Sequence, residues 1–185
     1  MSNAWYAVRV RSNFEQTTAA YLEAVGHQVF VPTYEQRKQG SDRIRRVRVP
    51  LFPGYVICHM DINLRMPVLA APGVVHIVGF GNDFVAVPDQ EIEAVRHILT
   101  AQVQVERWPY LAVGERVRIV EGPLAGLTGI LVDVRAKQRL IVSVHLLQRS
   151  VAAAVNREAV RPERQSGLLD RYDIRHEGYR ISGDS

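Results

Sequence analysis

Histidine and cysteine are the residues of this chain whose side chains could carry out acid–base or nucleophilic chemistry. The one cysteine, Cys58, stands next to His59, and the remaining histidines are scattered along the 185 residues. The segment from Tyr55 to Met60 has the composition of a β-strand, on which neighbouring side chains point to opposite faces. Cys58 and His59 therefore cannot pair directly, and we expect Cys58 to be a small buried hydrophobe.

The wider sequence contains no arrangement of residues that suggests catalysis or metal binding. It has no His-Glu-x-x-His motif, no glycine-rich phosphate loop and no nucleophile elbow. A single cysteine also excludes an internal disulfide and a metal site built on paired cysteines. The sequence therefore predicts a protein that is not an enzyme and that needs no metal and no cofactor.

An aromatic residue beside a bend is the most distinctive feature that could bind a partner. Pro50 and Pro53 bracket Leu51 and Phe52, and Gly54 then opens a run of strand-forming residues. Proline cannot donate a hydrogen bond to a sheet, so the regular strand must begin after Pro53. Phe52 is therefore expected at a strand entrance, either as an exposed anchor for a protein partner or as a core residue beside the bend.

Strand alternation extends this candidate surface. On the strand that follows the bend, Tyr55 and Ile57 share one face, while Val56 and Cys58 share the other. We expect Val56 and Cys58 to be buried, and Tyr55 and Ile57 to face outward beside Phe52.

Basic residues are concentrated in one segment. From Glu35 to Arg48 there are six basic and two acidic residues, so this segment carries a net charge of +4, which is the net charge of the whole chain. Turn-forming residues at 40–42 predict a hairpin. Two interpretations stay open: the hairpin contacts a polyanion, first of all a nucleic acid, or its charges keep a sheet edge soluble. The basic residues are Arg37, Lys38, Arg43, Arg45, Arg46 and Arg48.

These residues are held by a mixture of strands and helices. A capping pattern at Asn13 and Gln16 predicts a helix that ends at Gly26. The order of elements predicts an α+β domain with its helices covering one face of the sheet. We expect strands at 5–10, 28–34, 45–49, 55–60, 74–80 and 84–87, and helices at 13–26, 64–71 and 89–99.

The character of the sequence changes after about residue 105. Pro109 interrupts the pattern, and we assign residues 106–112 to a linker. Short strands at 116–120, 129–134, 140–144 and 150–155 then predict a small five-stranded barrel over 113–162. The first domain covers 4–105, and 163–185 is expected to be a polar tail.

Composition places the chain among soluble globular proteins. It is 47% hydrophobic and 23% charged, and charged residues interrupt every hydrophobic stretch. The start of the sequence has no basic region followed by an apolar one. We therefore expect a cytoplasmic protein of bacterial type with no membrane partner.

Several short motifs occur here in the order found in the NusG family. The first domain contains Trp5-Tyr6-Ala7-Val8, Val31-Pro32-Thr33 and Leu51-Phe52-Pro53-Gly54-Tyr55-Val56, followed by Pro72-Gly73-Val74-Val75. The run from Gly122 to Gly129 resembles the KOW motif, with Gly129 as its characteristic glycine. The resemblance spans about residues 4 to 162. It implies an NGN domain with a ferredoxin-like antiparallel sheet, followed by an SH3-like KOW barrel.

The resemblance also implies a function in transcription elongation and antitermination. Phe52 and Tyr55 match positions that pack on the clamp helices of the largest RNA polymerase subunit, and Ile57 matches an apolar neighbour. Trp5 matches the first-strand aromatic of the family, which either borders this surface or belongs to the core. Docking on the clamp helices would close the clamp over the DNA and suppress pausing.

The resemblance suggests further partners. Arg9 and Arg11 resemble positions near the upstream DNA and the non-template strand. We add Arg43, Arg45 and Arg46 of the basic segment to these candidate nucleic-acid contacts. The barrel positions Leu124, Leu127 and Leu147 stand where housekeeping members place aromatics that bind ribosomal protein S-ten or Rho.

Three questions stay open. The segment before Leu51 resembles specialised RfaH-like paralogues, but the histidine-threonine motif of those proteins is missing from 61–71. Ala152-Ala153-Ala154 admits a helical form of the second domain, although a barrel is favoured. KOW barrels also occur in ribosomal proteins, so an RNA-binding protein of the translation apparatus is the alternative function.

Overall fold

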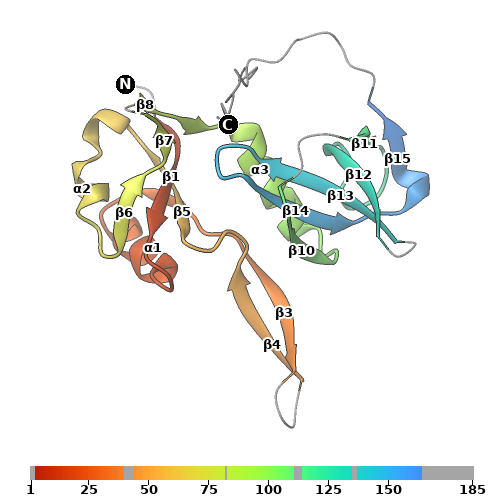
Figure 1. Cartoon of the computed structure of the whole chain (residues 1–185), viewed down its shortest axis with the longest axis horizontal. Coiled ribbons are helices and arrows are strands. Elements are labelled where there is room, and N and C mark those ends of the chain that lie inside the picture. The colour runs from red at the N-terminus through yellow and green to blue at the C-terminus, as the bar shows by residue number, and fades with distance from the viewer. Residues whose placement is uncertain (1–2, 40–43, 82, 111–113, 135–136, 164–185) are drawn as a thin grey trace, which may run out of the picture.

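Two antiparallel sheets lie on either side of a helix, α3 (Asp89–Thr100), in the computed structural model of the chain (Figure 1). The structure describes residues 3–39, 44–81, 83–110, 114–134 and 137–163. Among these residues no helix is long and apolar enough to cross a bilayer.

The N-terminal sheet is built around its first strand, β1 (Ala4–Val10). The order is β2 (Gln28–Phe30), β5 (Tyr55–Met60), β1 and β6 (Val74–Ile77), and β9 (Ala86–Val87) also pairs with β1. The pairing of β1 with β5 is antiparallel and places Trp5 opposite His59 and Arg9 opposite Tyr55. A strand with neighbours on both sides is well suited to hold binding residues rigidly.

Helices cover both faces of this sheet. Tyr6, Val8 and Val10 belong to one apolar cluster with residues of α1 (Glu15–Ala24) and α2 (Met66–Leu69). Trp5 and Ala7 point to the other face of β1 and belong to the cluster that contains the buried side of α3. The prediction that helices cover one face is therefore wrong, because β1 is apolar on both faces and needs cover on both.

Several element boundaries differ from the predicted ones. Asn13 does not cap α1, because it has a positive φ of 67° and the helix begins at Glu15. The helix predicted over 64–71 is a 3-10 turn, η1 (Ile62–Leu64), followed by the single-turn α2. The strand predicted over 74–80 is divided into β6 and β7 (Gly79–Phe80), which pairs with β8 (Asp83–Phe84).

The basic hairpin is a separate two-stranded ribbon. Its strands β3 (Thr33–Gln39) and β4 (Ile44–Pro50) pair only with each other among the described residues. The ribbon projects away from both sheets (Figure 1). The predicted hairpin is confirmed, while its tip, which includes Arg43, lies outside the described residues.

The C-terminal β domain is a six-stranded antiparallel sheet. The segment that admits a helical form, Ala152-Ala153-Ala154, lies in a strand in this structure. A short 3-10 turn, η2 (Arg157–Ala159), precedes the last strand. The order is β10 (Val105–Trp108), β14 (Arg149–Ala154), β13 (Lys137–Val144), β12 (Thr128–Val134), β11 (Arg116–Ile119) and β15 (Val160–Pro162).

Most of β10, the sixth strand of this sheet, comes from the segment predicted to be a linker. Val105–Trp108 pairs with β14, placing Val105 opposite Ala153 and Trp108 opposite Ser150. The interval 106–112 is therefore not a free linker, because its first residues complete the sheet edge. The tail predicted over 163–185 lies outside the described residues beyond Glu163.

Candidate functional site

The bend from Leu51 to Gly54 is held by hydrogen bonds to distant parts of the chain. Gly54 has a φ of +79°, which glycine adopts without steric cost. Its N–H donates to Oε1 of the buried Glu15 at 2.7 Å, and its carbonyl accepts from Val10 N–H at 2.9 Å. Leu51 N–H donates to the Pro32 carbonyl at 2.7 Å. These contacts fix the direction in which the chain enters β5.

Arg9 braces the same bend from β1. Its guanidinium lies 4.9 Å from the centre of the Tyr55 ring, and Nη1 donates to the carbonyl of Gly54 at 3.3 Å. A Cβ at position 54 would collide with Nη1 of Arg9. Arg9 therefore braces Tyr55 and Gly54 from the neighbouring strand. Arg11, two residues on, is exposed.

The predicted polymerase-binding residues lie together, but they are not exposed in this structure. Phe52 is 2% exposed, Ile57 1% and Trp5 7%, while Tyr55 is half-buried. The expectation that Ile57 and Phe52 face outward is therefore wrong for this arrangement. Parity assigned Ile57 to the correct face, on which Trp5, Phe52 and Ile57 share one apolar cluster. Burial of Val56 and Cys58 on the opposite side is confirmed.

The Trp5 ring lies against an imidazole ring and a guanidinium as well as apolar side chains. Its ring centre lies 4.9 Å from that of His59 and 5.0 Å from the guanidinium carbon of Arg96 on α3. The same guanidinium lies 5.0 Å from the Phe30 ring, and it pairs with Glu93 at 2.9 Å. Arg96 therefore ties α3 to two strands of the N-terminal sheet.

The predicted partner-binding leucines of the second domain belong to the same cluster as Phe52. Leu124 is 3% exposed, Leu127 9% and Leu147 3%. The two surfaces predicted to bind different partners thus form one continuous core between the domains. Gly129, the glycine of the KOW-like run, lies where β12 approaches β13 closely, since a Cβ there would collide with the carbonyl of Ile141.

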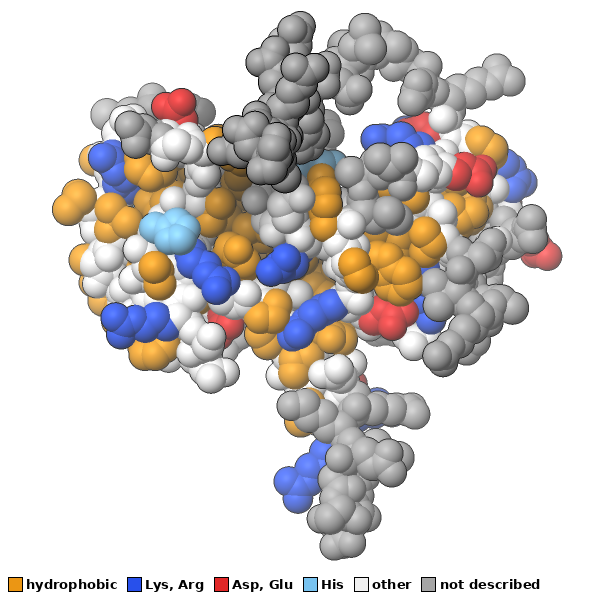
Figure 2. All heavy atoms as spheres, in the orientation of Figure 1, with side chains coloured by type: hydrophobic (Ala, Val, Ile, Leu, Met, Phe, Trp, Pro, Cys, Tyr) orange, Lys and Arg blue, Asp and Glu red, His pale blue; other side chains and the backbone are white. Residues whose placement is uncertain are grey.

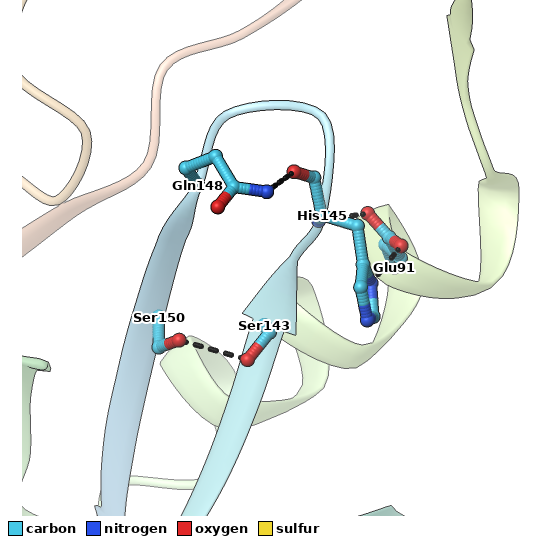
Figure 3. Close-up of polar contacts among 5 residues, drawn as sticks. All are labelled: Glu91, Ser143, His145, Gln148 and Ser150. Carbon is cyan, nitrogen blue, oxygen red and sulfur yellow. Dashed lines mark hydrogen bonds and ion pairs between the residues drawn. The ribbon is translucent and has the colours of Figure 1, made fainter. Parts of the chain in front are cut away.

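Three polar contacts join the domains around this core. Glu91 of α3 accepts from His145 N–H at 3.1 Å and lies 2.7 Å from Nδ1 of the same residue (Figure 3). His97 Nε2 lies 2.9 Å from the carbonyl of Pro123. Arg107 of β10 donates to the Pro50 carbonyl through Nη2 at 2.6 Å. All three contacts involve residues at the rim of the shared apolar cluster.

The turn that carries His145 is internally fixed. Gln148 Nε2 donates to the His145 carbonyl at 2.9 Å, and the hydroxyls of Ser143 and Ser150 lie 2.8 Å apart across the strands (Figure 3). The hydrogen bond with Glu91 raises the pKa of His145, and the Glu91 charge acts in the same direction, while partial burial and Arg116 oppose them. The protonated form of His145 therefore strengthens this contact between the domains.

The predicted nucleic-acid-binding residues fall into two groups. Arg9 and Arg11 lie at the end of β1, whereas Arg45 and Arg46 are exposed on β4, far along the ribbon. Arg45 lies five positions along the strand from the base of the ribbon at Pro50, a distance of about 17 Å. The structure therefore does not bring the two groups into one patch.

Sequence reasoning missed the residues that join the domains. No local pattern marks Glu91 as an interdomain residue, and Arg107 lies in the predicted linker. Glu15 is buried although acidic, because the N–H of Gly54 satisfies it. None of these roles has a local sequence signal, since each partner lies at least 39 residues away along the chain.

Comparisons with known proteins agree with this architecture. The family model described as "Transcription termination factor nusG" matches residues 3–96. The "Transcription termination/antitermination protein NusG" of Vibrio vulnificus is 32% identical over 160 residues, 79% of this chain and 88% of its own. The protein of the same name from Thermus thermophilus is 31% identical over 172 residues, 78% of this chain and 91% of its own.

A solved structure shares the fold. The structure titled "Domain interaction in Thermotoga maritima NusG" matches 88% of this chain and 98% of that chain, with a TM-score of 0.50 and 22% identity. The match supports the α+β architecture with a C-terminal β domain. From the family match and the relatives above 30% identity, the chain belongs to the NusG family of transcription termination and antitermination factors, which are not enzymes.

Proposed function

We propose that this protein binds RNA polymerase at the clamp helices of its largest subunit and suppresses pausing during elongation. The docking residues are Phe52, Ile57 and Tyr55, bordered by Trp5. The observation that carries this proposal is the rigid bend at Gly54, which sets these side chains on one apolar face. A fixed aromatic and aliphatic cluster of this kind is typical of a protein-binding anchor.

Docking at this face requires the domains to separate. Phe52 and Ile57 share one cluster with Leu124, Leu127 and Leu147, and all five are less than a tenth exposed. A polymerase helix cannot reach Phe52 while this cluster is closed. We infer that the protein binds polymerase in an open form, with the C-terminal β domain moved away from α3 and the bend.

The same opening would free the second binding surface. Leu124, Leu127 and Leu147 are apolar side chains on the turns of the C-terminal domain, and exposing them would create a patch suited to another protein. In this proposal that partner is ribosomal protein S-ten or Rho, as in relatives whose domain carries aromatics at these positions. Both interactions would thus depend on one conformational step.

Nucleic acid is the third partner in this proposal. Arg11 on the sheet, and Arg45 and Arg46 on the ribbon with Arg43 at its tip, would contact the upstream DNA and the non-template strand. Arg9 donates to the Gly54 carbonyl and lies over the Tyr55 ring, so it holds the docking face in addition to its proposed phosphate contact.

The alternative of an RNA-binding protein of the translation apparatus has weaker support. It requires a basic surface on the C-terminal domain. There, Glu163 lies 3.7 Å from Arg116 and 3.4 Å from Arg118, and Arg139 is largely buried against Glu106 at 2.9 Å. One carboxylate, Glu163, thus faces two of these arginines, and Arg139 is already paired within the chain.

The proposal is tested by locking the domains together reversibly. His97→Cys and Pro123→Cys place thiols at an existing interdomain contact, and a cleavable bismaleimide can join them. The native Cys58 does not interfere, because burial raises the pKa of its thiol to about 12. We expect the cross-linked chain to lose polymerase binding and to regain it when the linker is cleaved.

The control is the same double variant capped with a monofunctional maleimide, which modifies the thiols without joining them. It should bind polymerase as the unmodified variant does. If the cross-linked chain binds as tightly as the capped one, the buried cluster is not the docking surface.

A further inference from the structure

Strand β10 follows α3 in the chain and is fixed to both domains. It pairs along its whole length with β14 of the C-terminal sheet. Its Arg107 donates to the Pro50 carbonyl of the first domain through Nε at 3.1 Å and Nη2 at 2.6 Å, and the guanidinium lies 5.8 Å from the Tyr34 ring. β10 therefore lies close to the bend that carries Phe52, where the two domains pack against each other above the ribbon (Figure 2).

The free chain between α3 and this strand is very short. The helix ends at Thr100, and the carbonyl of Gln104 already accepts from Ala154 N–H of β14 at 3.0 Å. Residues 101–103 are thus the tether between the domains. Thr100 and Gln104 are four positions apart, so even a fully extended tether holds them within about 14 Å of each other. While β10 is paired with β14, the C-terminal sheet stays next to the end of α3.

This tether is too short for the opening that polymerase docking requires. The buried side of α3 and Phe52 belong to one cluster, and Val105 of β10 packs against it. A single helix with its side chains is about 10–12 Å across, and the proposed partner surface has more than one helix. A sheet that stays within about 14 Å of α3 leaves no room for such a surface on this cluster. Docking therefore needs a longer connection between the domains.

Release of β10 from β14 would supply this length. Beyond β10 the chain is fixed to the C-terminal sheet at Glu115, whose carbonyl accepts from Leu131 N–H at 3.0 Å. The chain from Thr100 to Glu115 can span up to about 50 Å when it is extended. The contact of Arg107 with Pro50 need not break in this step, because it does not involve β14.

β10 has the features of a strand that can detach. It has four residues, lies at the edge of its sheet and pairs only with β14 among the described residues. Glu106 lies 2.9 Å from Arg139, but the Glu106 side chain is 42% exposed, and Trp108 is only half-buried. Segments with few buried contacts open at a lower free energy than the centre of a sheet. The other five strands can keep their pairing when β10 leaves.

We propose that β10 is a strap that keeps the domains closed, and that it must leave β14 before polymerase docks at the face containing Phe52. This inference rests on the proposed function and adds a defined structural step to it. Two sets of contacts thus hold the closed form: the shared apolar cluster and the ladder between β10 and β14. Separation of the cluster alone does not permit docking, because the tether at 101–103 limits how far the domains can move.

The first test joins β10 to β14 by a disulfide in the full chain. Val105→Cys and Ala153→Cys place thiols at opposed positions of the ladder. The Cα atoms of such a pair lie about 4.5–5.5 Å apart, which a disulfide can span. We expect the oxidised chain to bind polymerase at least about tenfold more weakly than the same chain after reduction, because the form that can dock is no longer populated.

Two controls separate the strap from other effects of a disulfide. Arg118→Cys with Thr128→Cys joins β11 to β12, which stay paired in the proposal, so its oxidation should leave the affinity unchanged. In the chain with the β10–β14 disulfide, about ten glycine and serine residues inserted between Gln102 and Val103 lengthen the tether by up to about 35 Å and should restore binding. Equal affinity of the oxidised and reduced chains, or a longer tether that does not restore binding, would overturn the proposal.

The same measurements distinguish the strap from the docking face. If the cross-link between positions 97 and 123 abolishes polymerase binding while the β10–β14 disulfide does not, the docking face stands and the strap is wrong. If neither bond changes the affinity, both proposals are wrong.

Hydrogen exchange measures the release of β10 directly. In the free chain, the β10 amides that pair with β14 should exchange slowly. In the complex with polymerase they should lose this protection, while the amides of β13 keep theirs. Persistent protection of β10 in the complex would overturn the proposal, because docking would then occur with the strap in place.

Discussion

At the scale of single residues, Gly54 determines how the proposed docking face is presented. Its positive φ, the hydrogen bond to Glu15 and the close approach of Arg9 all meet at one position. A side chain there would be strained by the backbone and would also displace the Arg9 guanidinium from the Tyr55 ring. Position 54 therefore links a local backbone requirement to the geometry of the whole surface.

This role predicts a difference between two glycine substitutions with nearly the same backbone conformation. Gly54→Ala and Gly122→Ala both place an alanine at a positive φ, of +79° and +83°, but a Cβ at position 122 meets nothing within 4 Å. The shared backbone strain costs roughly 1–2 kcal/mol. We expect the free energy of unfolding to fall further for Gly54→Ala, as measured by urea denaturation. Equal losses would show that the contact with Arg9 is unimportant.

The sequence predicted correctly which residues of 55–60 share a face, but not how exposed each face is. Alternation along 55–60 separated Ile57 from Val56 and Cys58, and the structure keeps this separation. The alternation of side chains along a strand shows which residues share a face, but it does not show what covers that face. The cluster that contains Phe52 includes residues of α3 and of the C-terminal domain, which are distant in sequence, so its burial could not be predicted locally.

At the scale of elements, α3 connects the two domains. Its buried residues pack in the shared cluster, and Glu91 and His97 reach the C-terminal domain. The buried stripe of this helix was predictable from its spacing, because Ile92, Val95 and Ile98 recur at helical intervals. Its polar interdomain partners were not, since those contacts depend on the relative position of two domains.

The Glu91–His145 contact predicts a pH dependence of stability. The folded chain raises the pKa of His145 above its ordinary value of 6.5, so the folded state binds this proton more tightly than the unfolded state. The stabilisation is therefore fully present below about pH 6.5 and is lost as the pH rises through the folded pKa. The side chain is largely exposed, so we expect about 0.5 kcal/mol.

The measurement is the free energy of unfolding of the unchanged chain, His145→Gln, Glu91→Gln and the double variant between pH 5.5 and pH 8. The single variants should be less stable than the unchanged chain at low pH and should approach it at high pH. The double variant should lose little more than either single one. Additive losses, or a gap that widens with pH, would contradict this assignment.

Strand β10 shows where element prediction failed. Pro109 suggested a break, and the segment before it was assigned to the linker, yet Val105–Trp108 adds a strand to the C-terminal sheet. An edge strand needs only one partner, and proline just beyond its end is compatible with that position. The resulting sheet carries Arg107 to the base of the ribbon, where it contacts Pro50.

At the scale of the whole molecule, the predicted surfaces for two partners belong to one buried apolar cluster. Phe52 and Ile57 from the first domain and Leu124, Leu127 and Leu147 from the second form one cluster. The ribbon, by contrast, packs on this cluster only near its base, through Tyr34, and projects away from both sheets (Figure 1). In the closed arrangement the protein thus presents its basic ribbon while its proposed protein-binding surfaces are covered.

The central claim, that the face containing Phe52 binds RNA polymerase, is tested by the affinity of the full chain for polymerase. Phe52→Ala is compared with Val56→Ala, which removes a fully buried side chain from the opposite face of the same segment. Losing an aromatic anchor typically costs about 2 kcal/mol or more, which is roughly a 30-fold loss of affinity. We predict this loss for Phe52→Ala, and near-normal affinity for folded Val56→Ala. Unchanged or tighter binding of Phe52→Ala would contradict the account, because Phe52 would then serve only to hold the domains together.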